Sequence, residues 1–395
     1  MTDTQALEAQ LYMQAARRVP ITLVRGEGTR VWDDEGKEYL DFVAGIASCT
    51  FGHSDPELAE VIAEQARTLI HVSNIFYTEP QIELAQLLID HSSMDRVFFA
   101  NSGAEANEAA LKLARKWGRL NRDGAHEIVV AQNGFHGRTM ATVAATGTPA
   151  YREPFEPLVP GFVYVDFDDV EAIQSATNEH TAAVMLEPIQ GEGGINVPAD
   201  NYLRAVREWC DEQGMLLILD EVQVGMGRTG TLWAHEQAGI EPDIMTSAKA
   251  LGGGVPVGAV LSKEHASVFE PGNHGTTFGG QPLVTAAAAH VLRRVIEGDT
   301  LANVRARGDQ AASRLAALGE KHSVVRGVRG RGLLLGLELN EPIAPQVVVE
   351  SVGRGLLLNP VRPDVVRMMP PLNVSAEEID SAVDIIDGAI AEVTG

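Results

Sequence analysis

The chain has 395 residues, which at about 150 residues per domain allows two or three domains and excludes a small disulfide- or metal-stapled module. Its 31 Lys and Arg residues against 54 Asp and Glu residues give a net charge of -23. Because such a field repels phosphate backbones and anionic membranes, we expect neither nucleic acid nor a membrane surface as a partner.

The two cysteines, Cys49 and Cys210, lie far apart and outside any C-x-x-C spacing. We therefore expect no disulfide framework and no metal site, and a reducing, cytoplasmic location. The opening MTDTQALEAQ has no signal-peptide pattern, and no apolar run approaches the roughly 18 residues that span a bilayer, so neither export nor a membrane span is predicted.

Short strand-like stretches are expected first at residues 29–33 and 37–42. From about residue 96 to residue 262, short apolar runs alternate with segments of helical period, and the runs are RVFFA, EIVVA, AAVML, MLLIL, DIMTSA and GAVLS. This alternation predicts an α/β fold with a mainly parallel sheet and helices on both faces.

The last third of the chain begins with a helical pattern from Gln281 through Arg294 and then returns to strand-like pieces at 324–339, 355–359 and 365–371. Both chain ends thus differ from the middle. We expect a large cofactor-binding domain over residues 60–300. A smaller α+β domain is expected to form jointly from residues 1–59 and 301–395.

A turn that could bind phosphate follows the first predicted strand of the large domain. Ser102 and Glu105 have capping-box spacing. Gly103 and Ala104 follow with small side chains, so free backbone N–H groups at a helix start could accept an anion. The alternative is that every strand-to-helix turn forms a weak site of this kind.

Asp220 ends the most apolar strand of the chain, in LLILDEVQ. A carboxylate delivered there needs a buried cation, and a protonated pyridine nitrogen is one such partner. The alternative is an aspartate that caps the following helix.

Lys249 lies in DIMTSAKALGGG, a small and apolar setting. Desolvation there would lower the pKa of its ammonium and make the amine a nucleophile for a carbonyl group. The alternative is a lysine that extends from a loop to solvent. Asp220 and Lys249 are separated by one strand-loop-helix unit, so both can reach the same edge of the sheet.

Two further loops carry polar groups, NGFHGRT at residues 133–139 and HGTTFGG at residues 274–280. Either loop alone is ordinary. Together with Ser102, Asp220 and Lys249 they supply the parts that a phosphorylated pyridine aldehyde requires.

From about Thr29 to Leu372 the chain resembles the class III, fold type I pyridoxal-phosphate aminotransferases. The resemblance rests on HVSNIFYTEPQ, FFANSGAEANEAALKLAR, FHGRT, LEPIQGEGG, ILDEVQVGMGRTG and HGTTFGGQPL, in this order and spacing. It implies pyridoxal 5′-phosphate as the cofactor and no metal. It also implies a homodimer with shared active sites.

For the cofactor, the resemblance implies that Lys249 binds it covalently and that Asp220 contacts the pyridine nitrogen. Phe135 and Val222 would cover the two ring faces, and Thr277 would reach the phosphate of the neighbouring subunit. The full set of implied cofactor contacts is Ser102, Gly103, Ala104, Phe135, Asp220, Glu221, Val222, Gln223, Lys249 and Thr277.

For the substrates, the resemblance implies contacts from Arg138 and Thr276, an arginine for the α-carboxylate in Arg367, and an acid in Glu192 that pairs with it when no carboxylate is there. The implied reaction moves the terminal amino group of N2-acetyl-L-ornithine to 2-oxoglutarate, a step of arginine biosynthesis.

Several other activities stay open at this point. Succinylornithine, ornithine, 4-aminobutyrate or carrier-linked lysine could be the amine donor, because enzymes for these amines share the cofactor residues. A racemase or aminomutase would reuse the lysine and the cofactor, but it would not need the pair of Arg367 and Glu192. A nucleotide-binding dehydrogenase is disfavoured because no strand is followed by G-x-G-x-x-G. Nothing in the sequence favours a non-catalytic protein.

Overall fold

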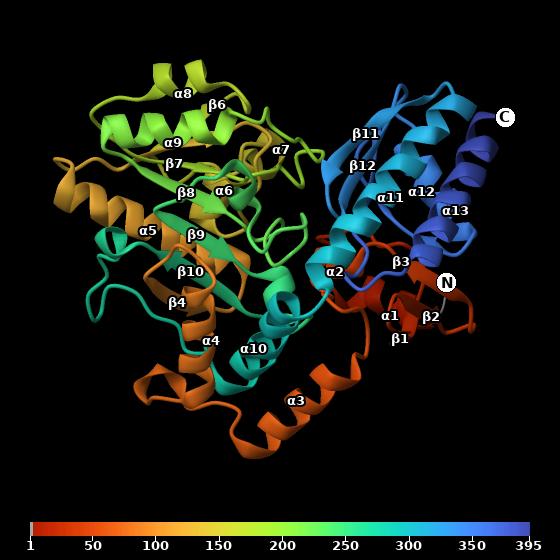
Figure 1. Ribbon diagram of the computed structural model, residues 1–395, viewed down its shortest axis with the longest axis horizontal. Helices are drawn as coiled ribbons and strands as arrows, with labels where there is room; N and C mark the ends of the chain where they lie inside the picture. Colours follow the sequence, from red (N-terminus) through yellow and green to blue (C-terminus); the bar gives the residue numbers. More distant parts are fainter. Residues whose placement is uncertain (1–2) are drawn as a thin grey trace.

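The computed structural model describes residues 3–395 and contains three sheets (Figure 1). The central sheet has seven strands in the order β4-β10-β9-β8-β7-β5-β6. Its strands are β4 (Arg96–Ala100), β5 (Glu127–Ala131), β6 (Phe162–Val165), β7 (Thr181–Leu186), β8 (Leu216–Asp220), β9 (Ile244–Ser247) and β10 (Gly258–Ser262).

The central sheet is mainly parallel, as predicted. Strands β6, β5, β7, β8 and β9 are parallel along the sheet. Only β10 is reversed, being antiparallel to both β9 and β4. Each of the predicted apolar runs forms a strand within one residue of its expected ends, and β6 is an additional strand that the predicted runs do not include.

Alternation of side chains along the strands divides the core of this sheet into two layers. Leu216 and Ile218 pack on one face with α5, whereas Leu217 and Leu219 pack on the other face with α8 and α9. Both faces are covered, which explains why these strands are continuously apolar. The helices are α5 (Gly103–Asn121), α8 (Val170–Ala176) and α9 (Tyr202–Gln213).

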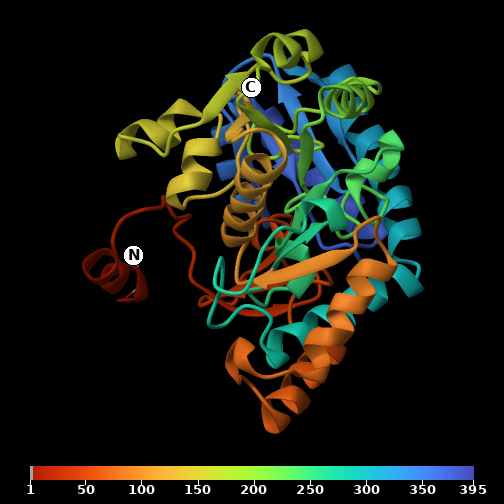
Figure 2. The same ribbon diagram turned by 90° about the vertical axis from the view of Figure 1, so that its left-hand side faces the viewer.

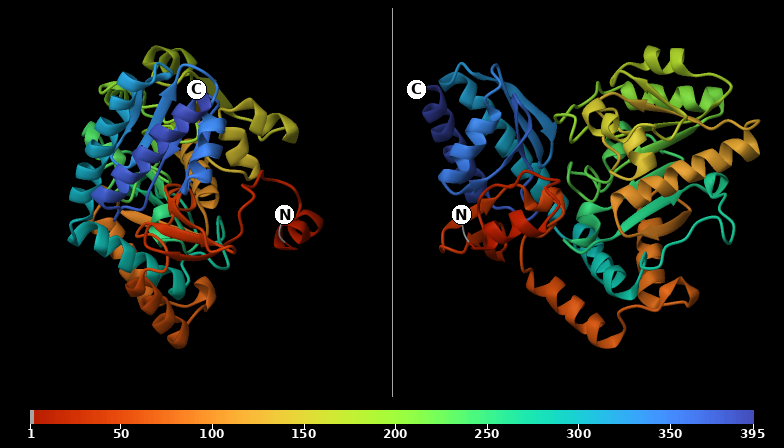
Figure 3. Two further views of the ribbon diagram at one scale, coloured as in Figure 1. Left: turned by 90° about the vertical axis from the view of Figure 1, so that its right-hand side faces the viewer. Right: turned by 180° about the vertical axis from the view of Figure 1, so that it is seen from behind.

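The two chain ends build a smaller α+β part beside the central sheet (Figure 3). In one of its sheets, β3 from the N-terminal segment is parallel to β13 from the C-terminal segment. The first sheet consists of β1 (Leu23–Glu27), β2 (Arg30–Asp33), β3 (Glu38–Asp41) and β13 (Leu356–Leu357). The second consists of β11 (Val325–Arg331), β12 (Leu334–Leu339), β15 (Val365–Met368) and β14 (Asn359–Arg362).

Helices connect and cover these sheets. The long helices α10 and α11 follow each other across Gly298 and Asp299, and α11 and α12 both pack against α13. In Figure 2 the N-terminal helix α1 lies apart from the body of the molecule. The remaining helices are α1 (Asp3–Leu11), α2 (Ala44–Ala47), α3 (Pro56–Thr68), α4 (Glu79–Asp90), α6 (Met140–Ala145), α7 (Pro149–Arg152), α10 (Pro282–Glu297), α11 (Thr300–Lys321), α12 (Ala344–Gly353) and α13 (Ala376–Thr394).

The largest hydrophobic cluster runs through both parts of the molecule. It joins Leu40 and Ile386 of the smaller part to Trp233 and Leu292 of the larger one. The core is therefore continuous, and the domain limits at residues 59/60 and 300/301 stay a prediction. Within residues 3–395, no helix is long and apolar enough to span a membrane.

Candidate active site

A cavity of about 430 Å³ opens beyond the carboxyl ends of β8 and β9. This is the edge at which parallel strands of an α/β sheet present polar side chains. The cavity gathers most of the predicted site residues, which are Ser102, Gly103, Ala104, Phe135, Arg138, Glu192, Asp220, Val222, Gln223 and Lys249.

Asp220, the last residue of β8, is almost fully buried and held by three donors. Its Oδ2 accepts a hydrogen bond from Asn107 Nδ2 at 2.7 Å and lies 2.9 Å from His136 Nδ1. Its Oδ1 accepts from the N–H of Val222 at 3.0 Å. Asn107 is fixed in turn by Thr246, whose hydroxyl donates to Asn107 Oδ1 at 2.7 Å. Donors therefore engage both oxygens of the Asp220 carboxylate and fix its orientation.

His136 completes this network as a buried partner of Asp220. Burial alone would lower the pKa of the imidazole, but the hydrogen bond to Asp220, and the charges of Asp220 and Glu187, outweigh it and raise the pKa. His136 therefore carries a proton over a wider pH range than a free histidine does.

Lys249 lies two residues beyond β9, at the start of the short 3-10 helix η4 (Lys249–Gly252). Burial lowers the pKa of its ammonium. The positive charge of Arg367 acts in the same direction, while Glu192, Asp220 and Glu187 oppose it. The lowered pKa increases the fraction of neutral, nucleophilic amine.

The turn before α5 offers backbone donors to the cavity. Ser102 caps the helix by accepting from the N–H of Glu105 at 3.2 Å. The predicted capping box is only half formed, because the Glu105 carboxylate accepts from Asn101 N–H at 2.7 Å and not from Ser102. The N–H groups of Gly103 and Ala104 belong to the first helical turn, which supplies them with no acceptor of its own.

Phe135 and Val222 line the cavity beside this turn. A Cβ atom on Gly103 would lie 2.7 Å from Val222 Cγ1, so the turn approaches Val222 as closely as a glycine permits. The guanidinium of Arg138 lies 5.2 Å from the centre of the Phe135 ring and 3.9 Å from that of Tyr151. Arg138 is exposed, so its charge is available at this position.

Glu187 fixes two loops of the cavity to each other. One carboxylate oxygen accepts from Phe135 N–H at 3.0 Å and the other from Gly191 N–H at 3.3 Å. Burial raises the pKa of Glu187 to about 7, an effect that the charge of His136 partly opposes.

Arg367 lies on β15, fully buried, and reaches the cavity residues from the smaller part of the molecule. Its Nη1 is 2.6 Å from Glu192 Oε1 and 3.4 Å from Gln223 Oε1, and its Nε donates to Asn359. Gln223 Nε2 also donates to Glu192 Oε1 at 3.3 Å. Within residues 3–395 the Nη2 group of Arg367 has no hydrogen-bond partner.

Besides Arg367, three predicted residues do not line the cavity. The Glu221 carboxylate is turned away and accepts from the backbone of Ala234 and His235 and contacts His235 Nδ1 at 2.8 Å. Thr276 accepts from Asn101 Nδ2 at 3.0 Å, and Thr277 is exposed. A single chain does not bring Thr277 to the cavity, so its contact with a neighbouring phosphate stays a prediction.

Sequence reasoning missed Asn107, His136 and Glu187, which connect the predicted residues. A weak signal existed for Asn107, a polar residue on the same helix face as Ala110 and Leu111, which follow it by three and four positions. His136 and Glu187 lie inside the quoted motifs FHGRT and LEPIQGEGG, but nothing in their spacing indicates which group each one contacts.

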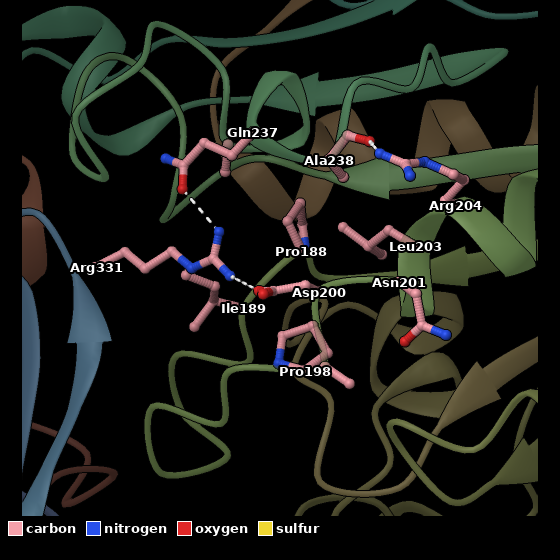
Figure 4. A pocket seen from close by; sticks show the side chains of 12 residues that line it. Pro188, Ile189, Pro198, Asp200, Asn201, Leu203, Arg204, Gln237, Ala238 and Arg331 are labelled. Carbon is pink, nitrogen blue, oxygen red and sulfur yellow. Dashed lines mark hydrogen bonds and ion pairs between the residues drawn. The ribbon is translucent and has the colours of Figure 1, made fainter.

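A second cavity, of about 410 Å³, shares the chain segment from residue 187 to residue 192 (Figure 4). It is lined by Pro188 and Ile189 instead of Glu187 and Glu192. Figure 4 shows Arg331 beside it, with the guanidinium bonded to Gln237 Oε1 at 2.9 Å and to Asp200 Oδ1 at 3.0 Å. The second arginine drawn there, Arg204, donates to the backbone carbonyl of Ala238 at 3.1 Å.

The residues of the first cavity fit the implied cofactor. Free N–H groups at Gly103 and Ala104 suit a phosphate, and a buried carboxylate at Asp220 suits a protonated ring nitrogen. Lys249 supplies an amine of lowered pKa for the aldehyde. The unpartnered Nη2 of Arg367 offers a donor for a substrate carboxylate.

Comparisons with known proteins agree with this chemistry. The family model for class III aminotransferases matches residues 11–390. An acetylornithine aminotransferase of Thermosynechococcus vestitus is 53% identical, with 97% of this chain and 96% of that protein covered. One from Methanocaldococcus jannaschii is 48% identical, with 98% of both proteins covered.

Solved structures also resemble the chain over nearly its full length. The ornithine aminotransferase of Toxoplasma gondii has a TM-score of 0.94 at 35% identity, covering 99% of this chain and 95% of the other. The N-acetylornithine aminotransferase of Stenotrophomonas maltophilia has a TM-score of 0.85 at 39% identity and covers 98% of both chains. The predicted fold type is confirmed.

Proposed function

The chain belongs to the class III aminotransferases, and from this premise we propose that it transfers the terminal amino group of N2-acetyl-L-ornithine to 2-oxoglutarate. The products are N-acetylglutamate 5-semialdehyde and L-glutamate, which places the enzyme in arginine biosynthesis. The choice of amine donor is supported by acetylornithine aminotransferases 47% to 53% identical to this chain, from cyanobacteria and archaea among others.

One observation carries the proposal: a buried arginine paired with an acid from a loop. Arg367 is fully buried, has one amino group on Glu192 and has the other without a partner in residues 3–395. Glu192 can leave Arg367 when a substrate carboxylate binds to the arginine. The ion pair can form again when the substrate has no such carboxylate. A transaminase whose two substrates differ at the reacting carbon needs this ability.

The cofactor is pyridoxal 5′-phosphate. When bound, it accepts the amino group and withdraws electrons from the bonds of the carbon that carries the nitrogen. We assign its phosphate to Ser102, Gly103 and Ala104, its ring faces to Phe135 and Val222, and its ring nitrogen to Asp220. Asn107 and His136 hold the Asp220 carboxylate in position through the bonds described above.

We assign the proton transfer to Lys249. Its lowered pKa leaves an amine that can take a proton from the substrate carbon and return it to the product side. The proximity of Glu192 and Asp220 prevents the pKa from falling further, so the protonated form stays accessible for the return step.

The two substrates then use the same arginines in different ways. Glutamate and 2-oxoglutarate carry a carboxylate on the reacting carbon and a second one further away, whereas acetylornithine reacts at a terminal CH₂ and keeps only a distant carboxylate. We assign the distant carboxylate to Arg138, with Thr276 as a further substrate contact. Arg367 binds the near carboxylate, and Glu192 neutralises Arg367 when the amine is bound, because an unpaired buried guanidinium is costly.

We also propose a cytoplasmic homodimer with shared active sites. Exposed apolar side chains gather beside the Thr277 loop: Ile75, Phe76 and Tyr77 are exposed, and Asn74 Nδ2 donates to Thr276 O at 3.0 Å. Phe278 follows on the loop itself and is 56% exposed. Both cysteines are free, which suits a reducing compartment.

The test of the reaction is a steady-state assay with a panel of amines against 2-oxoglutarate. We expect N2-acetyl-L-ornithine to give the highest kcat/KM, above succinylornithine, ornithine and 4-aminobutyrate. A higher kcat/KM for another amine would identify that amine as the donor instead. Isomerised substrate without glutamate would indicate a racemase or aminomutase instead.

The dimer can be tested by light scattering and by mixing inactive subunits. Lys249→Ala and Thr277→Ala chains refolded together should regain activity in mixed dimers, because one of the two sites then receives both native residues. An active monomer, or no gain on mixing, would contradict the shared site.

A further inference from the structure

The loop that carries Glu192 lies on a single row of residues across the sheet of β11, β12, β15 and β14. Arg329 pairs with Gly336, Gly336 pairs with Arg367, and Arg367 pairs with Asn359. Residues directly opposite each other on neighbouring strands project to the same face. Arg329, Arg367 and Asn359 therefore stand on one face, with a gap at Gly336.

The gap at Gly336 receives the end of the loop. A Cβ atom on Gly336 would lie 3.2 Å from Ile195 Cγ1 and 3.0 Å from Val365 Cγ1. Ile195 is fully buried, so it packs directly onto the backbone of this strand. A side chain at 336 would therefore require Val365 and Ile195 to shift by a few tenths of an ångström.

Two arginines hold the loop backbone on this row. Arg329 Nε donates to Gly194 O at 2.8 Å, and Arg362 Nε donates to Gly193 O at 2.9 Å. A Cβ atom on Gly194 would lie 3.1 Å from both Arg329 Nη2 and Arg362 Cγ, so the two side chains enclose this glycine. Hydrogen bonds from a charged donor are about twice as strong as neutral ones.

On the other side of Glu192, the loop is tied at Gly191. Its N–H donates to Glu187 at 3.3 Å, and a Cβ atom there would lie 1.7 Å from Gln223 Oε1. The backbone on both sides of Glu192 is therefore fixed, and the freedom that remains belongs to the Glu192 side chain. Fixing the backbone lowers the entropy cost of placing the Glu192 carboxylate on Arg367.

We propose that Arg329 and Arg362 are positioning residues that set the strength of the pair between Glu192 and Arg367. They thereby set the preference of the site between substrates with and without a carboxylate on the reacting carbon. This inference rests on the proposed function, because it concerns the same exchange of partners at Arg367. Neither arginine lines the cavity. Arg329 bonds the backbone of the Glu192 loop, and Arg362 does so as well while its Nη2 also donates to Asn133 Oδ1 at 2.9 Å.

The experiment uses the holoenzyme with Arg329→Gln, Arg362→Gln and the double variant. Single-turnover traces would give the apparent rate constant of each half-reaction separately. We expect the double variant to lose about tenfold in the acetylornithine half-reaction, through weaker apparent binding, while the 2-oxoglutarate half-reaction stays within about twofold. Arg329→Lys and Arg362→Lys keep a charged donor and should restore part of the loss.

Arg326→Gln is the matched control. Arg326 is on the same strand as Arg329 and bonds the same Glu338 carboxylate, at 3.0 Å, but has no bond to the loop. The ratio of the two half-reactions should not change in this variant. A change as large as in Arg329→Gln would overturn the inference, and so would an equal fall of both half-reactions in the double variant.

Two readouts do not depend on turnover. Hydrogen exchange in a peptide covering residues 190–196 should be faster in the double variant than in Arg326→Gln. Glutarate, a dicarboxylate without a reacting group, should bind the double variant more tightly, because Glu192 competes less well for Arg367. Unchanged exchange and unchanged glutarate binding would refute the inference. Failure of the wild-type enzyme to use acetylornithine would refute the proposed function alone, since glutarate binding still tests the loop.

Discussion

The two sides of the cavity are held in different ways. On one side is the strand-end group, which consists of Asn107, His136, Asp220 and Lys249. Asp220 ends β8, Lys249 lies two residues beyond β9, and Asp220 has donors on both carboxylate oxygens. Backbone and side chains there have little freedom to rearrange.

On the other side is the loop group, which consists of Glu192, Gln223 and Arg367. Its acid, Glu192, has a glycine on either side in the sequence, and a quarter of the Glu192 side chain is exposed. Its arginine retains a donor group without a partner in residues 3–395.

The difference follows from what each side has to do. The strand-end group handles chemistry that is the same for both substrates, so a fixed arrangement with both Asp220 oxygens hydrogen-bonded suits it. The loop group has to distinguish a substrate that has a carboxylate from one that has none. An incompletely bonded guanidinium and a removable acid make that possible. The following predictions test this division, starting with the largest effect.

Replacing Lys249 removes the one amine that the strand-end group presents to the substrate. We expect Lys249→Ala to reduce turnover by about 10⁴-fold or more in both half-reactions while cofactor binding, followed by absorbance, persists. Lys263→Ala is the control, since that lysine lies at the surface and pairs with Glu241. A borohydride-trapped cofactor on another lysine of the wild-type protein would contradict the assignment.

Glu192→Ala should affect only one half-reaction. Without the acid, Arg367 is unpaired when acetylornithine binds, so that half-reaction should slow by about 100-fold, whereas the 2-oxoglutarate half should be unchanged or faster. Single-turnover absorbance measures each half. If both fall equally, or if only the 2-oxoglutarate half falls, the division between the two sides is wrong.

Asn107→Ala should have the opposite signature, a similar loss in both half-reactions. Asp220 loses its 2.7 Å donor and the link to Thr246, and we expect a fall of roughly 10- to 30-fold in each rate. Asn121→Ala, at the exposed end of the same helix, is the control. A loss confined to one half-reaction would show that the strand-end group also discriminates between substrates.

Glu187 accepts hydrogen bonds from Phe135 and Gly191 and so connects the Phe135 loop to the loop that carries Glu192. We expect its titration to make the free energy of unfolding depend on pH. Its pKa is raised to about 7 from 4.5, so the folded state binds the proton more tightly than the unfolded state does. The resulting stabilisation is complete below pH 4.5 and is lost as the pH rises through 7.

Between pH 6 and pH 8 this loss amounts to about 1 kcal/mol. Glu187→Gln should not show it, so the free energy of unfolding of the variant relative to wild type should rise over that interval. Denaturant titrations of both proteins measure the difference, and Glu264→Gln at the surface is the control. A constant difference across the interval would mean that Glu187 does not titrate between pH 6 and pH 8, contrary to its raised pKa.

The parts of this site that sequence could predict are those encoded locally. Asp220 is recognisable because a continuous apolar run ends abruptly at a carboxylate, and Lys249 because its neighbours are small and apolar. The apolar runs likewise locate the strands of the central sheet. An apolar run does not indicate whether its strand is parallel or antiparallel to its neighbours. The reversal of β10 is therefore seen only in the structure.

Contacts between distant segments could not be derived in this way. Glu192 and Arg367 are 175 residues apart, and only the family resemblance connected them. Asn107 meets Asp220 because α5 crosses under β8, a packing that helical periodicity does not specify. The strand β1 was missed because LVRGE has a glycine and two charges and is mostly exposed, so it lacks the apolar alternation of a covered strand.

The pairing of β3 with β13 has a consequence for how the chain is made. Leu40 is synthesised early, but its strand partner Leu356 is added more than 300 residues later. Until then the edge of β3 presents unpaired backbone groups, and the first sheet of the smaller part stays open. The nascent chain therefore completes this part last, after the central sheet is available as a base, and during that interval the exposed edge is a target for chaperones.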